Sequence, residues 1–328
     1  MSPSTNTEHI LAIDLGGTKV AAAVIDTRGE ILFRCEEPTC QDGPQAGIEQ
    51  IARLVRHCLE QTGLPREAIR GIGVGIPAVL DPQDLVIWAP NLKGWRNVDL
   101  KGGLEAQLNL PAFIEYDGHT AVLGEWWQGA GRGYQSIAMI IIGTGIGGGL
   151  IVDGRLFRGF NRLAGAAGWF AMTASAASHP PLSASLGHWE SLAAGPAIAS
   201  RARELLPDFP DSRLHELPSF SAREVFENAR SGDALAIQCV DETAGILGLG
   251  VANIVSLTNP EIIILGGSIG SQGDLLETKI SEVVRQWAQP ISAGSVMVRS
   301  SELGTLAGLY GAAYAVIDRS MKLPPGKE

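Results

Sequence analysis

The sequence predicts an α/β protein of two lobes with a central cleft, and three observations support this fold class. Short apolar strands alternate with amphipathic helices along the chain. A strand, a glycine-rich turn and a second strand near residue 10 recur near residue 140. The length of 328 residues exceeds what a single core usually serves. Glycine turns that face each other from two related lobes imply a cleft, where small ligands bind.

The first half reads as an antiparallel edge followed by alternating helices and strands. Its strand candidates are 9–26, which holds two strands around a Gly-Gly turn, then 31–33, 71–77 and 112–116. Its helix candidates are about 120–128 and 47–62, the latter ended by Gly63 and Pro65. The order β-β-β-α-β-α-β-α predicts a sheet with a parallel core.

The second half begins in the same way. Residues 136–157, SIAMIIIGTGIGGGLIVDGRLF, again read as strand, glycine-rich turn and strand. A helical stretch over 233–257 stops at Asn259-Pro260, and EIIILGGSIG adds a strand that ends in glycines. Residues 171–186, rich in Ala, Ser and Pro, read as an irregular loop, and the chain after Met321 reads as a disordered tail.

Composition excludes several classes of partner. A net charge of −10 and a pI near 5.2 repel a phosphate backbone, and no Lys/Arg cluster relieves this repulsion, so we expect no nucleic-acid partner. The polar N-terminus lacks an apolar signal core, and no apolar run reaches the ~18 residues of a membrane helix, so we expect a cytoplasmic protein with no membrane partner. The scattered cysteines predict free thiols: Cys35, Cys40, Cys58 and Cys239.

The first glycine turn places a carboxylate at a strand end beside bare backbone. Its residues are Asp14, Gly16, Gly17, Thr18 and Lys19. Backbone N–H groups in such a turn can approach phosphate oxygens, while Asp14 can hold Mg²⁺ or its water shell. A plain hairpin turn is the alternative that this pattern alone leaves open.

Two further glycine sites follow in the second half. Gly143, Gly145 and Gly148 formally make GxGxxG, but strand-like residues follow where a dinucleotide site needs a helix, so a phosphate-cradling hairpin is favoured. After the strand EIII, Gly266 and Gly267 offer bare backbone to an adenine ring or ribose. A structural strand-to-helix turn is the open alternative for this last site.

Two acidic residues are candidates for substrate chemistry. Asp117 ends a strand before a helix, where its carboxylate can accept the proton of a nucleophilic hydroxyl during phosphoryl transfer, or act as an N-cap. Glu190 lies where the loop returns to helix and can accept hydrogen bonds from substrate hydroxyls, or simply complement the helix dipole. His188 and His179 read as loop histidines, and with no cysteine nearby zinc has little support.

Seven motifs in order resemble the ROK family of sugar kinases, within the actin/hexokinase-like ATPase superfamily. They span roughly residues 9 to 318 and read AIDLGGTKVAAAVID, GVGIPAVLD, APNLKGW, YDGHTAVLGE, IIGTGIGGGLIVDG, GHWESLAAG and NPEIIILGG. The resemblance implies two ribonuclease-H-like lobes, 1–118 and 119–304, the first completed by a C-terminal helix at about 305–320. It also suggests a homodimer or higher homo-oligomer.

The same resemblance implies ATP and Mg²⁺ as cofactors and assigns site residues. Asp117 matches the catalytic base. ATP and its phosphates are assigned to Asp14, Gly16, Gly17, Thr18, Lys19, Gly143, Thr144, Gly145, Gly147, Gly266 and Gly267, with Mg²⁺ carried by ATP near Asp14. The substrate is assigned to Pro77, Ala78, Asn91, Tyr116, Asp117, Ala166, Trp169 and Glu190.

The chain departs from the family pattern at the sugar and zinc residues. Family members usually read Ala-Gly-Glu-x-Gly-His where this chain has Ala-Gly-Ala-Ala-Gly-Trp, so Ala166 and Trp169 replace a sugar-binding glutamate and histidine. The family's Asn-Asp pair becomes Tyr116-Asp117. Residues 170–186 replace its zinc segment without any cysteine, so we expect no structural zinc.

These departures predict altered substrate choice. An indole can stack on an apolar ring face, but it cannot replace two hydrogen-bond partners. We therefore expect an ATP-dependent kinase for a sugar, modified sugar or cyclitol other than glucose, N-acetylglucosamine or N-acetylmannosamine. The alternative is a non-catalytic sugar-binding sensor or pseudokinase, because the family also includes repressors. Those carry a DNA-binding segment before the first motif, whereas eight residues precede the first strand here.

Overall fold

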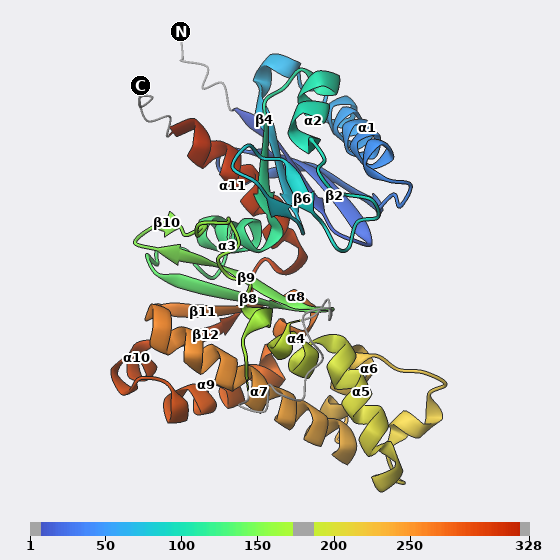
Figure 1. Cartoon of the computed structure of the whole chain (residues 1–328), viewed down its shortest axis with the longest axis vertical. Helices are drawn as coiled ribbons and strands as arrows, with labels where there is room; N and C mark the ends of the chain where they lie inside the picture. The colour runs from blue at the N-terminus through green and yellow to red at the C-terminus, as the bar shows by residue number, and fades with distance from the viewer. Residues whose placement is uncertain (1–7, 173–186, 322–328) are drawn as a thin grey trace. The chain divides into compact units, whose positions relative to one another are not determined.

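The computed structural model describes residues 8–172 and 187–321, which form two compact units (Figure 1). Unit 1 consists of residues 8–132, 156–164 and 305–321. Unit 2 consists of residues 133–155, 165–172 and 187–304. Nearly all of the predicted loop at 171–186, including His179, and the chain after Met321 fall outside the described residues. Each unit has its own sheet and its own hydrophobic core.

Unit 1 is built on one mixed sheet with strand order β3-β2-β1-β4-β7. Its strands are β1 (His9–Leu15), β2 (Lys19–Asp26), β3 (Ile31–Pro38), β4 (Ile69–Ile76) and β7 (Ala112–Tyr116). The predicted hairpin is confirmed, because β1 and β2 pair antiparallel, and β1, β4 and β7 form the predicted parallel core. The third strand runs five residues past its predicted end at Phe33, because its alternating exposed polar residues are typical of an edge rather than of an apolar run.

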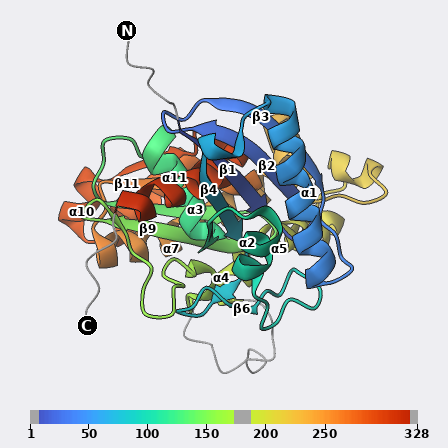
Figure 2. The same ribbon diagram turned by 90° about the horizontal axis from the view of Figure 1, so that it is seen from above.

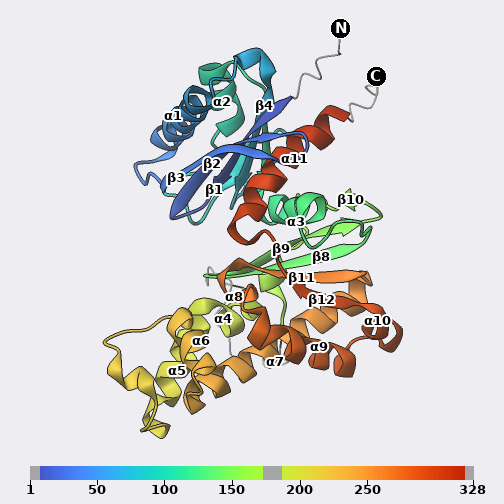
Figure 3. The same ribbon diagram turned by 180° about the vertical axis from the view of Figure 1, so that it is seen from behind.

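Helices cover both faces of this sheet (Figure 3). The helices of unit 1 are α1 (Pro44–Thr62), α2 (Leu100–Leu108), α3 (Asp117–Gln128) and α11 (Ala307–Met321). The 3-10 helix η1 (Arg66–Ala68) precedes β4, and the short strands β5 (Val79–Leu80) and β6 (Val86–Trp88) lie between β4 and α2. Apolar residues of α1 and α2 form a core with one face, and those of α11 form a core with the other. Viewed from above, α1 runs beside β2 and β3 (Figure 2).

Local signals explain the ends of these helices. α1 buries Ile48, Ile51, Val55 and Cys58, which are spaced by three and four residues, and it ends at Gly63 in the left-handed conformation (φ 63°). Helix α3, which the sequence boundary after residue 118 assigned to the second lobe, packs against α11 and lies in unit 1. The residue range of each unit therefore follows tertiary packing rather than the order of the motifs.

Unit 2 repeats the same strand arrangement, β10-β9-β8-β11-β12. The strands are β8 (Ile137–Ile142), β9 (Ile146–Val152), β10 (Arg155–Leu156), β11 (Ile262–Gly266) and β12 (Met297–Ser300). As in unit 1, a central strand pairs antiparallel with the next strand in sequence (β8 with β9) and parallel with a later one (β8 with β11). The predicted internal repeat is confirmed by this shared topology.

The helices of unit 2 pack around a long central helix. They are α4 (His188–Ala193), α5 (Gly195–Leu205), α6 (Ala222–Arg230), α7 (Ala234–Thr258), α8 (Gly267–Gly270), α9 (Gly273–Trp287) and α10 (Pro290–Ser295), with 3-10 helices η2 (Ala167–Trp169), η4 (Leu206–Asp208) and η5 (Arg213–Glu216). A last 3-10 helix, η6 (Gly304–Leu306), begins at the final residue of unit 2 and continues into unit 1. Asp233 caps α7 by accepting from the Ala236 amide, and Asn259 ends it in the left-handed conformation.

Helix α7 corrects one expectation about membrane segments. By length and composition alone it could cross a membrane, although the sequence pattern indicated no apolar run of sufficient length. More than half of its apolar window is buried in unit 2, where Leu247, Val251 and Val255 belong to the core. A buried core helix passes the same test, so this is weak evidence for a membrane span.

The four cysteines are free, as predicted, and the sulfurs of Cys35 and Cys58 lie 3.8 Å apart.

Candidate active site

The predicted site residues fall into two groups, one in each unit. Unit 1 holds Asp14, Gly16, Gly17, Thr18, Lys19, Pro77, Ala78, Asn91, Tyr116 and Asp117, and unit 2 holds Gly143, Thr144, Gly145, Gly147, Ala166, Trp169, Glu190, Gly266 and Gly267. Each group clusters around the end of a central strand that is followed by a glycine turn.

In unit 1, the glycine turn after β1 has all four of its carbonyls bound by the protein. The Lys19 carbonyl accepts from the Gly16 amide at 2.8 Å. Residues at the exit of β3 bind the other three: Thr39 donates to the Gly16 and Thr18 carbonyls, and Gln41 donates to the Gly17 carbonyl at 2.8 Å. Within residues 8–172 and 187–321, nothing accepts a hydrogen bond from the Gly17 and Thr18 amides. Bare amides without competing carbonyls favour an anion.

The neighbourhood of this turn explains one of its glycines. A β-carbon on Gly17 would lie 2.9 Å from the Asn91 side chain and 3.0 Å from its carbonyl oxygen, so only glycine fits against the 89–95 loop. Asn91 itself is exposed, while Pro77 and Ala78 directly follow β4 in the same sheet. Lys19 is also exposed, and its ammonium lies 3.2 Å from Glu36 on β3.

Two carboxylates lie at the carboxyl ends of the parallel strands of unit 1. Asp14 is next to last in β1, and Asp117 directly follows β7. Burial raises the pKa of Asp117 to about 6, against the hydrogen bond that its Oδ1 accepts from the Gly118 amide at 2.7 Å. Burial also raises the pKa of Asp14 to about 6, and the negative charge of Asp117 adds to the shift. Both carboxyls therefore titrate near neutrality.

The alternative role of Asp117 as an N-cap is wrong. The N-cap of α3 is Tyr116, which has an extended backbone, and Asp117 is the first residue inside the helix. Its carboxylate accepts a hydrogen bond from the adjacent Gly118 amide of its own turn. A carboxylate in this position keeps acceptor capacity for a ligand while the helix dipole favours its charge.

In unit 2, the turn after β8 is held by a carboxylate. Glu190, in the first turn of α4, accepts from the Ile146 amide at 2.7 Å, and its carboxylate lies so close to Gly145 that a β-carbon there would collide with it. Burial raises the pKa of Glu190, while the Ile146 amide opposes the shift. Gly143 forms the other side of the turn, where its carbonyl accepts from the Gly195 amide at 2.8 Å.

The third glycine site lies against this same turn. Gly267 has a positive φ of 79°, and a β-carbon on it would collide with the Ile142 carbonyl at the end of β8. The adjacent Ser268 hydroxyl lies 3.7 Å from where a β-carbon on Gly143 would be. The structure therefore brings the second and third glycine motifs together within unit 2.

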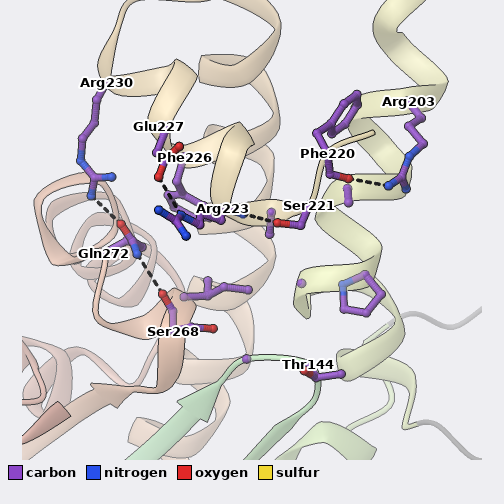
Figure 4. Close-up of a pocket in the computed structure, with 16 residues that line it drawn as sticks. Thr144, Arg203, Phe220, Ser221, Arg223, Phe226, Glu227, Arg230, Ser268 and Gln272 are labelled. Atoms are coloured by element: carbon purple, nitrogen blue, oxygen red, sulfur yellow. Dashed lines mark hydrogen bonds and ion pairs between the residues drawn. The ribbon is translucent and has the colours of Figure 1, made fainter. Parts of the chain in front are cut away.

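A pocket of about 640 Å³ opens beside these glycines (Figure 4). Its lining comes from the turn after β8, from α5, from α6 and the loop before it, and from α8 and the turn after it: Gly143, Thr144, Gly195, Pro196, Ala199, Arg203, Phe220, Ser221, Ala222, Arg223, Phe226, Glu227, Arg230, Ser268, Ile269 and Gln272. Figure 4 shows Thr144 and Ser268 on one side, with the α6 residues and Phe220 on the other. Its size suits a nucleoside.

The arginines of this pocket are paired within the protein. Arg230 binds both oxygens of Asp274 at 2.6 and 2.7 Å, and Arg223 donates to Glu227 at 2.8 Å. Arg203 donates to the Phe220 carbonyl and stacks over the Phe220 ring, 5.1 Å from its centroid. The walls thus combine apolar and aromatic surface with neutralised charge, which suits an uncharged aromatic ring system better than an anion.

Comparison with known proteins identifies the family. A sequence model of the ROK family matches residues 10–319. This chain belongs to the ROK family. It is 32% identical over 323 residues to a glucokinase of Halalkalibacterium halodurans, covering 97% of this chain and 98% of that protein. The ROK kinases matched at the level of structure confirm the predicted actin/hexokinase-like α/β fold.

Two further ROK relatives illustrate the range of the family. The structure of a ROK family glucokinase from Streptomyces griseus, in complex with glucose and AMPPNP, superimposes with a TM-score of 0.79 at 30% identity and covers 93% of this chain and 98% of that one. A xylose repressor of Caldicellulosiruptor bescii is 28% identical, over 96% of this chain and 79% of its own length. Membership in the ROK family therefore supports sugar recognition, and glucokinase relatives support sugar phosphorylation.

Two of the residues that depart from the family pattern, Ala166 and Trp169, belong to the segment that packs beside the second glycine turn. Trp169 ends the 3-10 helix η2, which packs against β9 and α4, and its indole is 52% exposed. Gly168 next to it lies against the Ile146 carbonyl and the Glu190 side chain. His188 is structural in this region: it is the first residue of α4, and its Nδ1 accepts from the Met172 amide at 2.9 Å. No group of three or more His, Cys, Asp or Glu that could hold a metal occurs among the described residues.

Sequence reasoning missed the far wall of the pocket. Arg223, Phe226 and Arg230 lie along the whole length of α6, Phe220 comes from the loop before it, and Arg203 comes from α5. These residues carry no glycine motif, and their spacing is that of an ordinary amphipathic helix. The capping box of Ser221 and Glu224 signalled where α6 begins, but not what its first turn faces.

Proposed function

We propose that this chain catalyses ATP-dependent phosphorylation of a hydroxyl of a sugar, modified sugar or cyclitol, with Asp117 as general base. The observation that carries the proposal is the position of Asp117 at the carboxyl end of β7, with a pKa raised to about 6 by burial. A base with a pKa slightly below the working pH is ionised and still accepts a proton well.

The residues present fit a nucleoside triphosphate. The pocket beside Gly143 and Ser268 has the volume and the apolar and aromatic walls that suit an adenosine moiety. Within unit 1, the Gly17 and Thr18 amides would bind phosphate oxygens and Asp14 would hold the magnesium ion. Within unit 2, the Gly143–Thr144 turn is the candidate phosphate-binding backbone. ATP would supply the transferred phosphoryl group, and the ion would neutralise part of its charge.

In this mechanism the protein's main task is to position and deprotonate the acceptor. Asp117 accepts the proton of the acceptor hydroxyl as that oxygen attacks the γ-phosphorus, and ADP leaves. Glu190 and Asn91 would orient other hydroxyls of the acceptor. The Glu190 carboxylate is suited to this role because its Oε2 is already fixed by the Ile146 amide.

The test is ATP consumption over a panel of hexoses, aminosugars, deoxysugars and inositols. With the best acceptor, Asp117→Asn should lower kcat by about 10²–10⁴-fold, because general base catalysis is lost, while the affinity for ATP stays the same. Asp153→Asn is the matched control: Asp153 is exposed with a positive φ of 50°, a conformation that asparagine tolerates. Full activity of the Asp117→Asn enzyme would disprove the assigned mechanism.

We further propose that Ala166 and Trp169 set the choice of acceptor. A half-exposed indole can stack on an apolar ring face of the substrate, and the methyl group of Ala166 offers no hydrogen bond. The double variant Ala166→Glu/Trp169→His should raise kcat/KM for glucose by about tenfold or more and lower it for the natural acceptor. An unchanged order of preference across the panel would place specificity elsewhere.

A non-catalytic sugar sensor is the second candidate function. The similarity to a xylose repressor over 96% of this chain favours it. Calorimetry distinguishes the two functions: a sensor binds a sugar with measurable heat, yet no ADP is formed with ATP, magnesium and any acceptor of the panel.

A further inference from the structure

The buried histidine of α3 has both ring nitrogens facing acceptors. His119 and Glu115 are almost fully buried in unit 1. Nδ1 of His119 lies 3.0 Å from Glu115 Oε1, and Nε2 lies 2.9 Å from the carbonyl oxygen of Ala164. A carbonyl oxygen can only accept, and so can an ionised carboxylate. A neutral imidazole has a single N–H, so one of these close contacts would bring two lone pairs together.

The surroundings of Glu115 decide where the proton resides. Its other oxygen, Oε2, accepts from Arg158 Nε at 2.8 Å, and the Arg162 guanidinium lies 3.8 Å from Oε1. Two guanidinium groups favour the ionised carboxylate, and a carboxyl is intrinsically the stronger acid of the pair. This arrangement of acceptors and guanidinium groups favours a proton on each nitrogen of the His119 ring.

His119 and its neighbours join α3 to a distant part of the chain. Ala164 belongs to residues 156–164, which lie between two stretches of unit 2 in sequence but pack in unit 1. Arg158 reaches Glu115 from this segment. Arg162, with a positive φ of 56°, donates to Asp84 Oδ1 at 2.6 Å and to the Ile114 carbonyl of β7 at 3.2 Å. The segment is thus fixed to β7 and α3 by partly buried contacts, several of them charge-assisted.

These contacts surround the residues assigned to the acceptor. Asp117 lies two residues before His119 in the first turn of α3. The Tyr116 ring meets the His119 ring edge to face, with centroids 5.2 Å apart. Ala164 directly precedes Gly165 and Ala166 in the chain. Because the His119 ring is held at both nitrogens, it restricts the Tyr116 side chain, which is next to Asp117 in sequence. It also restricts the first turn of α3, which carries Asp117.

We propose that His119 is held as an imidazolium that fastens residues 156–164 to α3 and thereby positions Asp117 and Tyr116 for the acceptor. His119 acts as a positioning residue, not as a catalytic one, because its two donors are used within the protein. The charged groups that face it are Glu115 from β7, Arg158 and Arg162 from the 156–164 segment, and Asp117 from its own helix. The positioning role rests on the proposed kinase function, whereas the charge of the ring does not.

The charge is tested directly by NMR of ¹⁵N-histidine-labelled protein. At pH 7.5 we expect both ring nitrogens of His119 to be protonated, with two exchange-protected imidazole protons. In Glu115→Gln the carboxylate is removed, and we expect a neutral ring whose single proton lies on Nε2, toward Ala164. A single protonated nitrogen in the wild-type protein would overturn the proposal, whatever the outcome of any activity assay.

The fastening is tested by hydrogen exchange. His119→Gln keeps a donor near the position of Nε2 but removes the charge and the contact with Glu115. Amides of residues 156–164 should exchange about tenfold faster in this variant, while those of α7 in unit 2 keep their wild-type rates. Unchanged exchange in 156–164 would show that the ring does not hold the segment.

The positioning role is tested by steady-state kinetics. Misplacement of a base by about 1 Å can cost ~10²-fold in rate, so we expect kcat to fall roughly 10–100-fold in His119→Gln and KM for ATP to stay within about twofold. His215→Gln, an exposed histidine of unit 2, is the matched control and should match the wild type. An unchanged kcat in a folded His119→Gln enzyme would overturn the positioning role. A wild-type protein without ATP turnover, but with the two-proton ring, would instead refute the kinase function.

Discussion

The two units share one strand arrangement but differ in what lies at the ends of their strands. In unit 1, two of the parallel strands have an aspartate at their carboxyl ends: Asp14 in β1 and Asp117 directly after β7. In unit 2 the position that corresponds to Asp14 is Ile141, because each residue is one pair before the end of its hairpin ladder. The residue that follows β12 is Ser301. The repeat preserves the scaffold and changes the chemistry at its ends.

The two glycine turns differ in the same sense. The turn of unit 1 has four residues between its paired strands, and donors from residues 39 and 41 bind its carbonyls. The turn of unit 2 has three, and the Glu190 carboxylate occupies the Ile146 amide. An amide bound to a carboxylate does not bind a phosphate. Under the proposed function, proton and metal chemistry belongs to unit 1 and nucleoside recognition to unit 2.

Gly267→Ala is expected to have the largest effect on unit 2. Position 267 has a positive φ and lies against the Ile142 carbonyl, so alanine would strain the backbone by roughly 1–3 kcal/mol and displace Ser268 from the pocket. We expect KM for ATP to rise on the order of 10–100-fold and KM for the acceptor to stay within about twofold. Gly245→Ala in α7, where a β-carbon meets open space, is the control. Equal effects on both substrates would break the assignment of the nucleoside to unit 2.

The acidic limb of the pH profile sharpens the assignment of unit 1. Asp117 must be ionised to accept a proton, and its pKa is raised to about 6. We expect kcat/KM to be constant above pH 7 and to fall at least tenfold per pH unit well below 6, with a steeper fall where the protonation of Asp14 adds to that of Asp117. Adenosine affinity, measured by calorimetry, should change less than about twofold between pH 6 and 8, because the guanidinium groups of its pocket do not titrate. A turnover that rises as pH falls would contradict a carboxylate base.

The smallest expected effect is on stability. Burial raises the pKa of Asp117 above its ordinary value of 3.8, so the folded state holds the proton more tightly than the unfolded chain does. Its stabilising effect is therefore complete below about pH 4 and is lost as pH rises through about 6. Asp117→Asn should raise the free energy of unfolding by roughly 1–3 kcal/mol at pH 8 and leave it unchanged at pH 4. The lower end of this range allows for solvent screening, because Asp117 is partly exposed. Denaturant titrations at both pH values provide the measurement, and a gain of equal size at pH 4 would contradict a burial-raised pKa as the cause.

Much of the fold was predictable because its signals are local. The β1–β2 hairpin follows from two apolar runs around Gly16-Gly17, and the end of α7 follows from Asn259, which adopts the left-handed conformation that stops a helix. The glycine motifs were also legible, because Gly17 and Gly267 are required by close backbone approaches. Motifs of this kind also carried the family resemblance.

The rest depended on contacts that no local pattern encodes. Glu115 and His119 have the spacing of a helical pair, but the partners that define their charge state, Arg158 and Ala164, come from about 40 residues later. No feature of the amino-acid composition indicates that residues 156–164 pack in unit 1, between two stretches of unit 2 in sequence. The far wall of the unit 2 pocket also combines residues that are distant in sequence, from Arg203 to Arg230. Such features depend on tertiary packing, which overrides what single segments prefer.

The position of α11 has a consequence for how the protein is made. One apolar face of the first two strands, with Ile10, Ala12 and Ala23, is covered by residues 309–317 at the opposite end of the sequence. During translation these strands leave the ribosome some 300 residues before their cover does. Unit 1 therefore cannot complete its core until residues 309–317 have been synthesised, and its nascent hairpin stays prone to aggregation in the meantime.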